Sequence, residues 1–453
     1  MELKNKKVLV IGFAVTGIPL VKVLNTLGAS IIVNDLRTEE DLKDSIAELH
    51  GIDVNYYLGK HPDNIEELGK IDLAIISPGI PLTIPFVKEI QKAGIELIGE
   101  IELAYRLSRG TIIAITGTNG KTTTTALMGE IFKNANRNTH VVGNIGVAAI
   151  SKALETKEDD YIIMEISSFQ LESCVYFHPH IATVLNITPD HLNRHGNMEN
   201  YADIKFSIFK NQNQRDYAII NYDNDITYDK SKDLNNVIYF SRISELQRGV
   251  FVKDNNIIIK ENENEIEVIH IKDIRIPGMH NVENALAATT MSYYSGISVE
   301  TIRETLKAFK GVEHRIQYVD SINGVSFYND SKATNINSTI KAIESVEAPI
   351  ILLAGGMDKG DEFDLLFEGL HNKVKSMFVY GETASKILDS GRKYGFNSIF
   401  KVTNLKEAVM GAYKISNDGD SILLSPACAS WDMYKNFEER GKEFINLVAN
   451  LRG

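Results

Sequence analysis

Residues 111–134, TIIAITGTNGKTTTTALMGEIFKN, contain the pattern that decides the fold. The apolar run at their start predicts a buried strand, and the segment from residue 122 to residue 135 predicts a helix. In the Gly-rich turn between them, several backbone N–H groups can face one point. Lysine adds a positive charge, the next hydroxyl can bind Mg²⁺, and the helix N-terminus favours anions. These features predict a phosphate-binding loop made of Gly117, Thr118, Asn119, Gly120, Lys121, Thr122 and Thr123.

The loop departs from the strict P-loop pattern at one position. Ile115 stands where that pattern has its first glycine. The alternative is a Gly-rich strand-to-helix turn that binds no ligand. Because strand, loop and helix occur in the order that a phosphate site needs, we favour phosphate binding.

Polar residues end the next two predicted strands. In YIIMEISSFQ, Glu165 follows four apolar residues, and ATVLNITPDH ends in Asp190 and His191. Ligands collect at the carboxyl edge of parallel sheets, so these side chains are expected on the same edge as the loop. Without the loop, Glu165 would be interpreted as the point where the strand leaves the core for solvent, and His191 as a structural histidine. With the loop, we favour Mg²⁺ binding by Glu165.

Lys205 lies in the segment YADIKFSIF, residues 201–209. In a helix, residues 201, 204, 205, 208 and 209 would share one face, and all except Lys205 are apolar or aromatic. One interpretation is a lysine whose long stem packs on the core while its ammonium reaches water. The other is a desolvated lysine whose pKa falls far enough for it to react.

The rest of the chain alternates short apolar strands with amphipathic helices, which indicates an α/β protein with parallel sheets. A length of 453 residues suits about three domains. We predict a Rossmann-like N-terminal domain at residues 1–99, a central P-loop ATPase-like domain with a parallel sheet at 100–311, and a Rossmann-like C-terminal domain at 312–453. Within the central domain, residues 227–277 carry short polar strands with a hairpin signal at Asp-Asn-Asn.

The composition excludes several classes of protein. A formal net charge of −12 argues against bulk binding to nucleic acids or to anionic membranes. Two distant cysteines, Cys174 and Cys428, favour a reducing compartment over a disulfide or zinc framework. Because no apolar run approaches the length of a membrane span, we expect a cytoplasmic protein.

The N-terminal turn Gly12 to Gly17 imitates a dinucleotide fingerprint, with Asp35 at the end of the next strand. Ala14 replaces the middle glycine, so the inference of NAD binding is weak. A nucleotide diphosphate still suits such a turn, and the alternative is a Rossmann-like turn without a ligand.

Together these motifs resemble the Mur ligases over essentially the whole chain. GTNGKTT, GNIG, MEISSFQLE, NITPDH, HNVENALAA and NDSKATN resemble the segments that recur in that family. SPGI at residues 77–80 and SPACASWDMYKNFEERG at 425–441 resemble the branch that adds D-glutamate. The Asp-Asn-Pro motif of the diaminopimelate-adding branch is absent from the sequence.

The resemblance implies an ATP-dependent ligase of peptidoglycan precursor synthesis, which would join D-glutamate to UDP-N-acetylmuramoyl-L-alanine through an acyl phosphate. It implies two Mg²⁺ sites, a CO₂-derived carbamate on Lys205 and a monomer. Catalytic roles would fall to Lys121, Lys205, His191, Asp330 and Lys332, and metal binding to Thr122, Glu165, His191 and Lys205. Further ATP contacts would come from Asn281, Asn284, His314 and Arg315. Substrates would contact Val15, Thr16, Asp35, Leu36, Arg37, Gly79, Asn144, Thr334, Lys359, Ser430 and Phe437.

Three alternatives remain at this point. The chain could be a sister ligase that adds another amino acid, or a regulatory protein that binds ATP and a UDP-sugar without ligation. A dehydrogenase is the weakest of the three, because Ala14 breaks its fingerprint and the phosphate loop would stay unexplained. At the uridine, Leu36 also departs from the threonine that the family resemblance leads us to expect.

Overall fold

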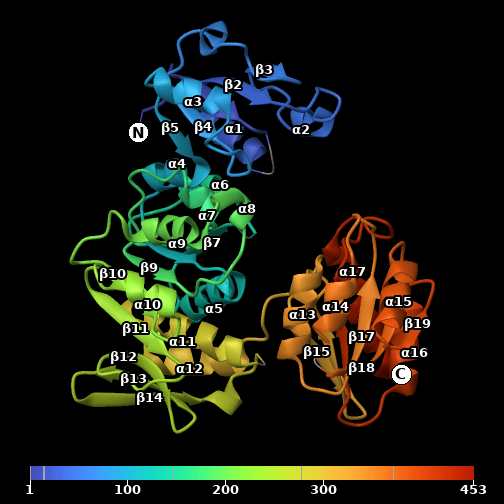
Figure 1. Cartoon of the computed structure of the whole chain (residues 1–453). Coiled ribbons are helices and arrows are strands. Elements are labelled where there is room, and N and C mark those ends of the chain that lie inside the picture. Colours follow the sequence, from blue (N-terminus) through green and yellow to red (C-terminus); the bar gives the residue numbers. More distant parts are fainter. Residues whose placement is uncertain (1, 14–15, 145, 277, 371, 453) are drawn as a thin grey trace. The chain divides into compact units, whose positions relative to one another are not determined.

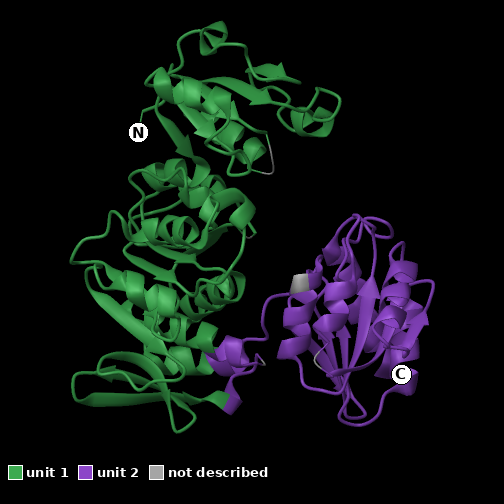
Figure 2. Cartoon of the chain, viewed as in Figure 1, with its two compact units in different colours: residues 1–271, 283–305 green, residues 272–282, 306–453 purple. Residues whose placement is uncertain are grey.

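The computed structural model describes residues 2–13, 16–144, 146–276, 278–370 and 372–452. Its strands form three sheets, each built largely from parallel neighbours (Figure 1). The chain divides into two compact units, residues 1–271 with 283–305 and residues 272–282 with 306–453 (Figure 2). The first two sheets belong to the first unit and the third sheet belongs to the second. The predicted α/β class with parallel sheets is confirmed.

The first sheet has the strand order β3-β2-β1-β4-β5, with every pair parallel. Because the strand order reverses beside β1, the turns after β1, β2 and β4 meet at a switch point where ligands bind in such sheets. Gly12, Asp35 and Ser77 stand at this edge. The elements are β1 (Lys7–Ile11), α1 (Gly17–Thr26), β2 (Ser30–Asp35), α2 (Lys43–Ala47), β3 (Val54–Leu58), β4 (Leu73–Ile76), α3 (Pro85–Lys92) and β5 (Leu97–Gly99).

The second sheet has nine strands in the order β14-β13-β12-β11-β10-β9-β6-β8-β7. Its parallel strands are β6 (Thr111–Thr116), β7 (Thr139–Gly143), β8 (Tyr161–Glu165), β9 (Ile181–Val184), β10 (Tyr217–Asn221) and β11 (Val237–Ser241). On one side β12 (Gly249–Lys253) pairs in parallel with β11, and β13 (Asn256–Glu261) and β14 (Asn264–His270) follow it in antiparallel order. The predicted hairpin signal is confirmed at Asp254 and Asn255, whose φ angles of 49° and 62° suit a two-residue turn.

Helices cover the second sheet and follow its strands. They are α4 (Glu100–Leu107), α5 (Lys121–Asn134), α6 (Ala149–Ala153), α7 (Ser168–Leu171), α8 (Leu192–His195), α9 (Met198–Phe206) and α10 (Asp225–Ser231), with α11 (Met279–Tyr294) and α12 (Val299–Ala308) following the hairpins. Among the described residues, no helix combines the length and the apolar character needed to cross a bilayer.

The third sheet has the order β15-β16-β20-β17-β18-β19, and only the β15–β16 pair is antiparallel. Its strands are β15 (Gln317–Ile322), β16 (Val325–Asn329), β17 (Ile350–Gly355), β18 (Val374–Tyr380), β19 (Ile399–Lys401) and β20 (Ser421–Leu424). Its helices are α13 (Ile336–Ser345), α14 (Asp364–Glu368), α15 (Ala384–Lys393), α16 (Leu405–Ile415) and α17 (Phe437–Ala449).

One helix begins later than its sequence suggests. The segment from Trp431 reads as a helix directly after the strand, which would place Ser430 near the helix N-cap. In the structure residues 431–436 form turns, and α17 begins at Phe437. The cause is Asn436, whose side chain accepts a hydrogen bond from the backbone N–H of Glu439 and so caps the helix there.

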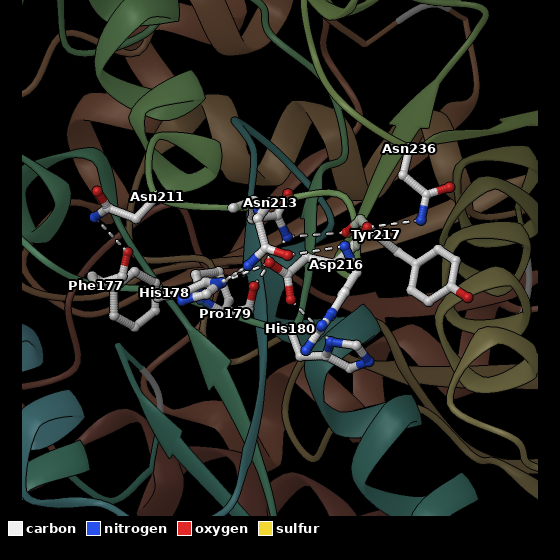
Figure 3. A network of polar contacts seen from close by, with 11 residues as sticks. Phe177, His178, Pro179, His180, Asn211, Asn213, Asp216, Tyr217 and Asn236 are labelled. Atoms are coloured by element: carbon white, nitrogen blue, oxygen red, sulfur yellow. Dashed lines mark hydrogen bonds and ion pairs between the residues drawn. The ribbon is translucent and has the colours of Figure 1, made fainter.

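Asp216 joins the neighbouring strands β9 and β10 at their amino ends, whereas the phosphate loop lies at the carboxyl edge of the sheet. Figure 3 shows the polar contacts around Asp216. Its carboxylate lies 2.6 Å from Nε2 of His178 and 3.0 Å from Nδ1 of His180, just before β9. It also accepts a hydrogen bond from the backbone N–H of Asn213. Burial raises the pKa of Asp216, but these hydrogen bonds outweigh it and hold the pKa below the ordinary value.

Candidate active site

The phosphate loop joins β6 to α5 at the carboxyl edge of the second sheet. Gly117 and Gly120 have φ angles of 149° and 84°, which favour glycine. A Cβ atom on Gly120 would lie 2.2 Å from Oδ1 of Asn284. The loop therefore requires glycine at this position for both its conformation and its packing.

Asn186 holds the loop in shape, a role that the sequence analysis did not identify. Its side chain accepts a hydrogen bond from the backbone N–H of Asn119 at 2.9 Å and donates to the carbonyl of Asn119 at 3.2 Å. Its backbone carbonyl accepts from the N–H of Thr118. The available signal was its position as the first strongly polar residue after the β9 strand.

Lys121 is the first residue of α5 and is half-buried. Its Nζ donates to the carbonyl oxygens of Gly117 and Thr118, both at 2.8 Å. The adjacent Thr122 is buried. Lysine and hydroxyl are therefore next to the loop N–H groups, as phosphate and Mg²⁺ binding require.

Lys205 lies on α9 and is only 1% exposed, so its amine does not reach water as the first interpretation supposed. Its Nζ donates to the carbonyl of Gly117 at 2.9 Å and lies 4.8 Å from the ring centre of Tyr201. Burial lowers the pKa of Lys205 to about 7, and the charge of Lys121 acts in the same direction while Asp190 opposes it. A large fraction of this amine is neutral near pH 7.

Glu165 ends β8 and is also almost fully buried. Its Oε1 accepts a hydrogen bond from the side chain of Asn144 at 2.8 Å, and its backbone carbonyl accepts from the Asn144 N–H. Within the described parts of the chain, Oε2 has no hydrogen-bond partner. A buried carboxylate oxygen without a donor suits a cation.

The protein supplies few conventional metal ligands at this edge. No three His, Cys, Asp or Glu side chains among the residues described could together hold a metal ion. A Mg²⁺ ion would therefore need the Thr122 hydroxyl, Glu165 and oxygens from the bound nucleotide, which is usual for this ion.

His191 stands apart from the buried pair. It has a left-handed φ of 52°, is exposed, and lies 3.6 Å from the carboxylate of Asp190. Its ring contacts Phe169 at 4.8 Å between centres. In the parts of the chain that are described, no hydrogen bond or ion pair joins His191 to Glu165 or Lys205. The structure thus brings Glu165 with Asn144 and Lys205 with Lys121, but leaves His191 with Asp190.

The two asparagines of α11 are both buried. Asn284 accepts a hydrogen bond from the hydroxyl of Thr124 at 3.3 Å and also packs against Gly120. Asn284 therefore contacts the start of the loop helix, as an ATP-site residue would. Asn281 lies one turn earlier in the same helix.

In the first domain, Asp35 ties two turns together. Its carboxylate accepts from the N–H of Phe13 at 2.6 Å, and from the N–H and guanidinium of Arg37 at 2.8–3.0 Å. Burial raises the pKa of Asp35, but the hydrogen bonds from Arg37 and Phe13 bring it down to about 2. Arg37 also donates to the carbonyl of Phe13. These hydrogen bonds join the turn after β1 to the turn after β2.

The other predicted contacts of the first domain surround this turn. Leu36 is 61% exposed, which leaves its side chain available to a ligand. Thr16 is the residue before α1, and its side chain makes no capping hydrogen bond. Gly79 is exposed after β4. Val15 lies outside the described residues.

In the third domain, Asp330 follows β16 and is buried. It accepts hydrogen bonds from the hydroxyl of Ser425 at 2.8 Å and from the N–H of Ile316 at 3.2 Å. Burial raises its pKa to about 7, against the opposing effects of these hydrogen bonds and of the charges of Arg315 and Arg440. Ser425, which donates a hydrogen bond to Asp330, was not among the residues predicted from the sequence.

His314 and Arg315 begin the third domain. His314 is buried in a left-handed conformation, and its Nδ1 lies 2.9 Å from Nδ2 of Asn329. Burial lowers the pKa of His314, which favours the neutral ring. Arg315 is half-buried beside it. The ring of His314 meets Phe437 edge-on at 6.3 Å.

The remaining predicted residues of the third domain make separate local contacts. Nζ of Lys332 lies 5.6 Å from the ring centre of Phe437. The exposed Lys359 donates to the carbonyl of Thr334 at 3.3 Å. Ser430 is buried, and its carbonyl accepts from the N–H groups of Met433 and Tyr434. The structure therefore groups Lys332 with Phe437 and Lys359 with Thr334.

Three family models match the chain in order. They are the Mur ligase MurD-like N-terminal domain at residues 6–99, the Mur ligase middle domain at 115–292, and the Mur ligase glutamate ligase domain at 314–428. The chain belongs to the Mur ligase family. This Mur ligase therefore has the three domains typical of its family.

Similar proteins extend over the full length of this Mur ligase. A UDP-N-acetylmuramoylalanine–D-glutamate ligase of Alkaliphilus oremlandii is 59% identical, with all of both chains covered. The protein of the same name from Clostridioides difficile is 49% identical, also with full coverage of both.

Solved structures agree on the fold. The MurC UDP-N-acetylmuramate–alanine ligase of Thermotoga maritima has a TM-score of 0.57 at 17% identity, covering 98% of this chain and 100% of that one. A pseudomurein peptide ligase type C of Methanothermus fervidus has a TM-score of 0.56 at 20% identity, covering 98% and 100%. At these identities the likeness concerns the fold alone.

Proposed function

We propose that this Mur ligase joins D-glutamate to UDP-N-acetylmuramoyl-L-alanine at the expense of ATP, in the synthesis of peptidoglycan precursors. The observation that carries the proposal is sequence identity of 59% and 55%, over the full length, to two proteins that bear this activity in their names. The local geometry agrees with it, because a phosphate loop, a half-buried lysine and a buried amine meet at Gly117.

The reaction has two steps, and in each step one bond forms and one breaks. A carboxylate oxygen of the L-alanine attacks the γ-phosphorus of ATP, which gives an acyl phosphate and releases ADP. The neutral amine of D-glutamate then attacks the acyl carbon, loses a proton, and expels inorganic phosphate as the amide forms. Two anions must approach in the first step, so positive charge and N–H groups at the phosphates provide most of the stabilisation.

Lys121 and the backbone of residues 117–123 are suited to the ATP phosphates. Thr122 and Glu165 would hold one Mg²⁺, and Glu165, His191 and a carbamate on Lys205 a second. When bound, Mg²⁺ supplies charge neutralisation at the phosphates. Support comes from Oε2 of Glu165, which has no hydrogen-bond partner in the part of the chain that the structure describes, and from the lowered pKa of Lys205.

The carbamate requires a neutral amine. Its nitrogen would add to CO₂ with release of one proton, which converts a buried neutral amine into a buried anion with two oxygen ligands. The apolar surroundings of Lys205 disfavour the ammonium form and therefore favour the neutral amine that the carbamate requires. His191 would have to turn away from Asp190 to share a metal with this group.

We assign the UDP-sugar to the first domain, around Thr16, Asp35, Leu36, Arg37 and Gly79, with Asn144 and His191 near its alanyl end. D-Glutamate is assigned to Thr334, Lys359, Ser430 and Phe437. ATP would also contact Asn281, Asn284, His314 and Arg315, with Asp330 and Lys332 acting in catalysis. The domain boundaries follow as 1–99, 100–311 and 312–453. We further propose a monomer that works in the cytoplasm, where its two free cysteines remain reduced.

The test is an assay with the purified chain, ATP, Mg²⁺, UDP-N-acetylmuramoyl-L-alanine and single amino acids. We expect ADP release that depends on D-glutamate, with a product whose mass equals both substrates less one water. ADP release with a different amino acid would indicate a sister ligase. Binding of ATP and UDP-sugar without ADP release under any of these conditions would indicate a regulatory protein.

A further inference from the structure

Arg440 is the largest side chain buried completely in the described structure. It lies in the first turn of α17, where the partial positive charge of the helix N-terminus disfavours a cation. Transfer of an ionised group from water to a protein interior is costly unless it is paired. Its position therefore needs an explanation beyond packing.

Arg440 has neutral hydrogen-bond partners, as far as the chain is described. Its Nε donates to the hydroxyl of Ser331 at 3.0 Å, and its Nη2 donates to the carbonyls of Ser331 at 2.8 Å and Cys428 at 3.1 Å. Its Nη1 lies 3.4 Å from the carbonyl of Ala429. Within the described residues, no carboxylate forms an ion pair with it. The charge in this interior is satisfied by hydrogen bonds but is not neutralised.

These partners belong to the segments that carry the predicted amino-acid site. Ser331 stands between Asp330 and Lys332, and Ala429 directly precedes Ser430. The hydroxyl of Ser331 donates onward to the carbonyl of Phe437 at 2.8 Å. One guanidinium thus fixes the turn after β16, the turn after β20 and the start of α17 relative to one another.

We propose that Arg440 is a positioning residue for the amino-acid substrate: it holds these three turns in register and places beside the residues assigned to D-glutamate a positive charge that favours a dicarboxylate. This inference rests on the assignment of D-glutamate to the third domain. Because the planar fork of arginine serves several acceptors at once, lysine cannot replace it.

The charge of Arg440 already acts on neighbouring groups. Burial raises the pKa of Asp330 to about 7 and that of Cys428 to about 11, and in both cases Arg440 opposes the effect by favouring the anion. A carboxylate of a bound substrate would be favoured by the same charge.

The test is steady-state kinetics of full-length variants Arg440→Lys, Arg440→Met and Ser331→Ala. We expect the KM for D-glutamate to rise about 10- to 100-fold in the Arg440 variants and roughly 3- to 10-fold in Ser331→Ala, as loss of charge-assisted or neutral hydrogen bonds would cause. The KM values for ATP and UDP-N-acetylmuramoyl-L-alanine should stay within about 2-fold. Ser376→Ala is the control, because Ser376 is a nearly buried serine of the same sheet that bonds Ser398 instead.

The outcomes separate the two proposals. If wild-type protein releases no ADP with D-glutamate, the proposed function fails, whatever the variants do. If the wild type ligates and Ser331→Ala raises all three KM values equally, or none, the positioning role is wrong. The same holds if Ser331→Ala only lowers the melting temperature. If the Arg440 variants do not fold, the KM for D-glutamate of Ser331→Ala, compared with that of Ser376→Ala, still tests the positioning role.

Discussion

Lys121 and Lys205 direct their amine nitrogens at one atom, the carbonyl oxygen of Gly117, at 2.8 Å and 2.9 Å. Two full positive charges that share one acceptor repel each other, and Lys205 is the more deeply buried of the two. Lys205 is therefore the partner that loses its proton more readily. One carbonyl thus accepts hydrogen bonds from two lysines, and burial lowers the pKa of Lys205 to about 7.

The proposed carbamate predicts an unusual order of activity among Lys205 variants. Lys205→Arg keeps a positive charge but cannot form a carbamate, so its ligase activity should be lost. Lys205→Ala should also be inactive, and added acetate should restore part of the activity by placing a carboxylate in the gap. The measurement is ADP release with and without acetate. Full activity in Lys205→Arg would end the carbamate hypothesis.

The buried Lys205 also predicts a cost in stability. With a folded pKa of about 7 and an unfolded pKa near 10.4, the unfolded chain binds more protons between these values, so stability rises with pH across this range. In CO₂-free buffer, Lys205→Met should therefore be more stable than wild type at pH 7, by on the order of 2–4 kcal/mol. The difference in stability between Lys205→Met and wild type should become smaller towards pH 10.

Denaturant unfolding of both proteins at several pH values measures this difference. Lys210→Met is a suitable control, because Lys210 is an exposed lysine close by in the sequence. Equal stabilities of wild type and Lys205→Met at pH 7 would mean that the lysine is not desolvated in solution.

Lys121→Ala should nearly abolish turnover, because it removes the charge nearest to the loop N–H groups. It also removes two hydrogen bonds to loop carbonyls, so we expect a destabilisation of about 1 kcal/mol. Single-turnover ADP formation at saturating ATP, together with a thermal melt, checks both effects. Near-normal turnover would show that residues 117–123 are not the ATP phosphate loop.

Much of the fold could be predicted because its signals are local. The strand before Gly117, the helix after it and the hairpin at Asp254 and Asn255 each depend on residues that are neighbours in the sequence. The spacing around Lys205 likewise predicted a helix there, although α9 ends at Phe206 and a 3-10 turn carries the buried Ile208 and Phe209. Periodicity and turn chemistry act over a few residues, so they can be read without the structure.

The remaining features depend on contacts between distant residues. Asn186 shapes the phosphate loop from 67 positions away, and Arg440 reaches Ser331 from 109 positions away. No sequence pattern near Arg440 predicts that its charge is buried. The late start of α17 was missed for a local reason, because the capping strength of Asn436 outweighed the helical appearance of the residues before it.

The contacts of Asp216 predict that the local stability of the amino ends of β9 and β10 depends on pH. Because its folded pKa is held below the ordinary value, its contribution is present above the unfolded pKa of about 4 and is lost as the pH falls through the folded value. Asp216→Asn should lower the opening free energy of these strands by about 1–3 kcal/mol at pH 7. The difference from wild type should narrow below about pH 4.

Hydrogen exchange of the β9 and β10 amides, read strand by strand at pH 7 and near pH 4, measures this effect directly. Asp229→Asn is the matched control, because Asp229 pairs with Lys232 on the exposed surface, where an ion pair contributes little. Replacement of His178 or His180 by glutamine should produce part of the loss seen in Asp216→Asn, since each ring lies within 3.0 Å of the same carboxylate. If Asp216→Asn and Asp229→Asn exchanged alike at pH 7, the two histidines and the carboxylate would merely be neighbours, and the strand ends would be held by their backbone hydrogen bonds alone.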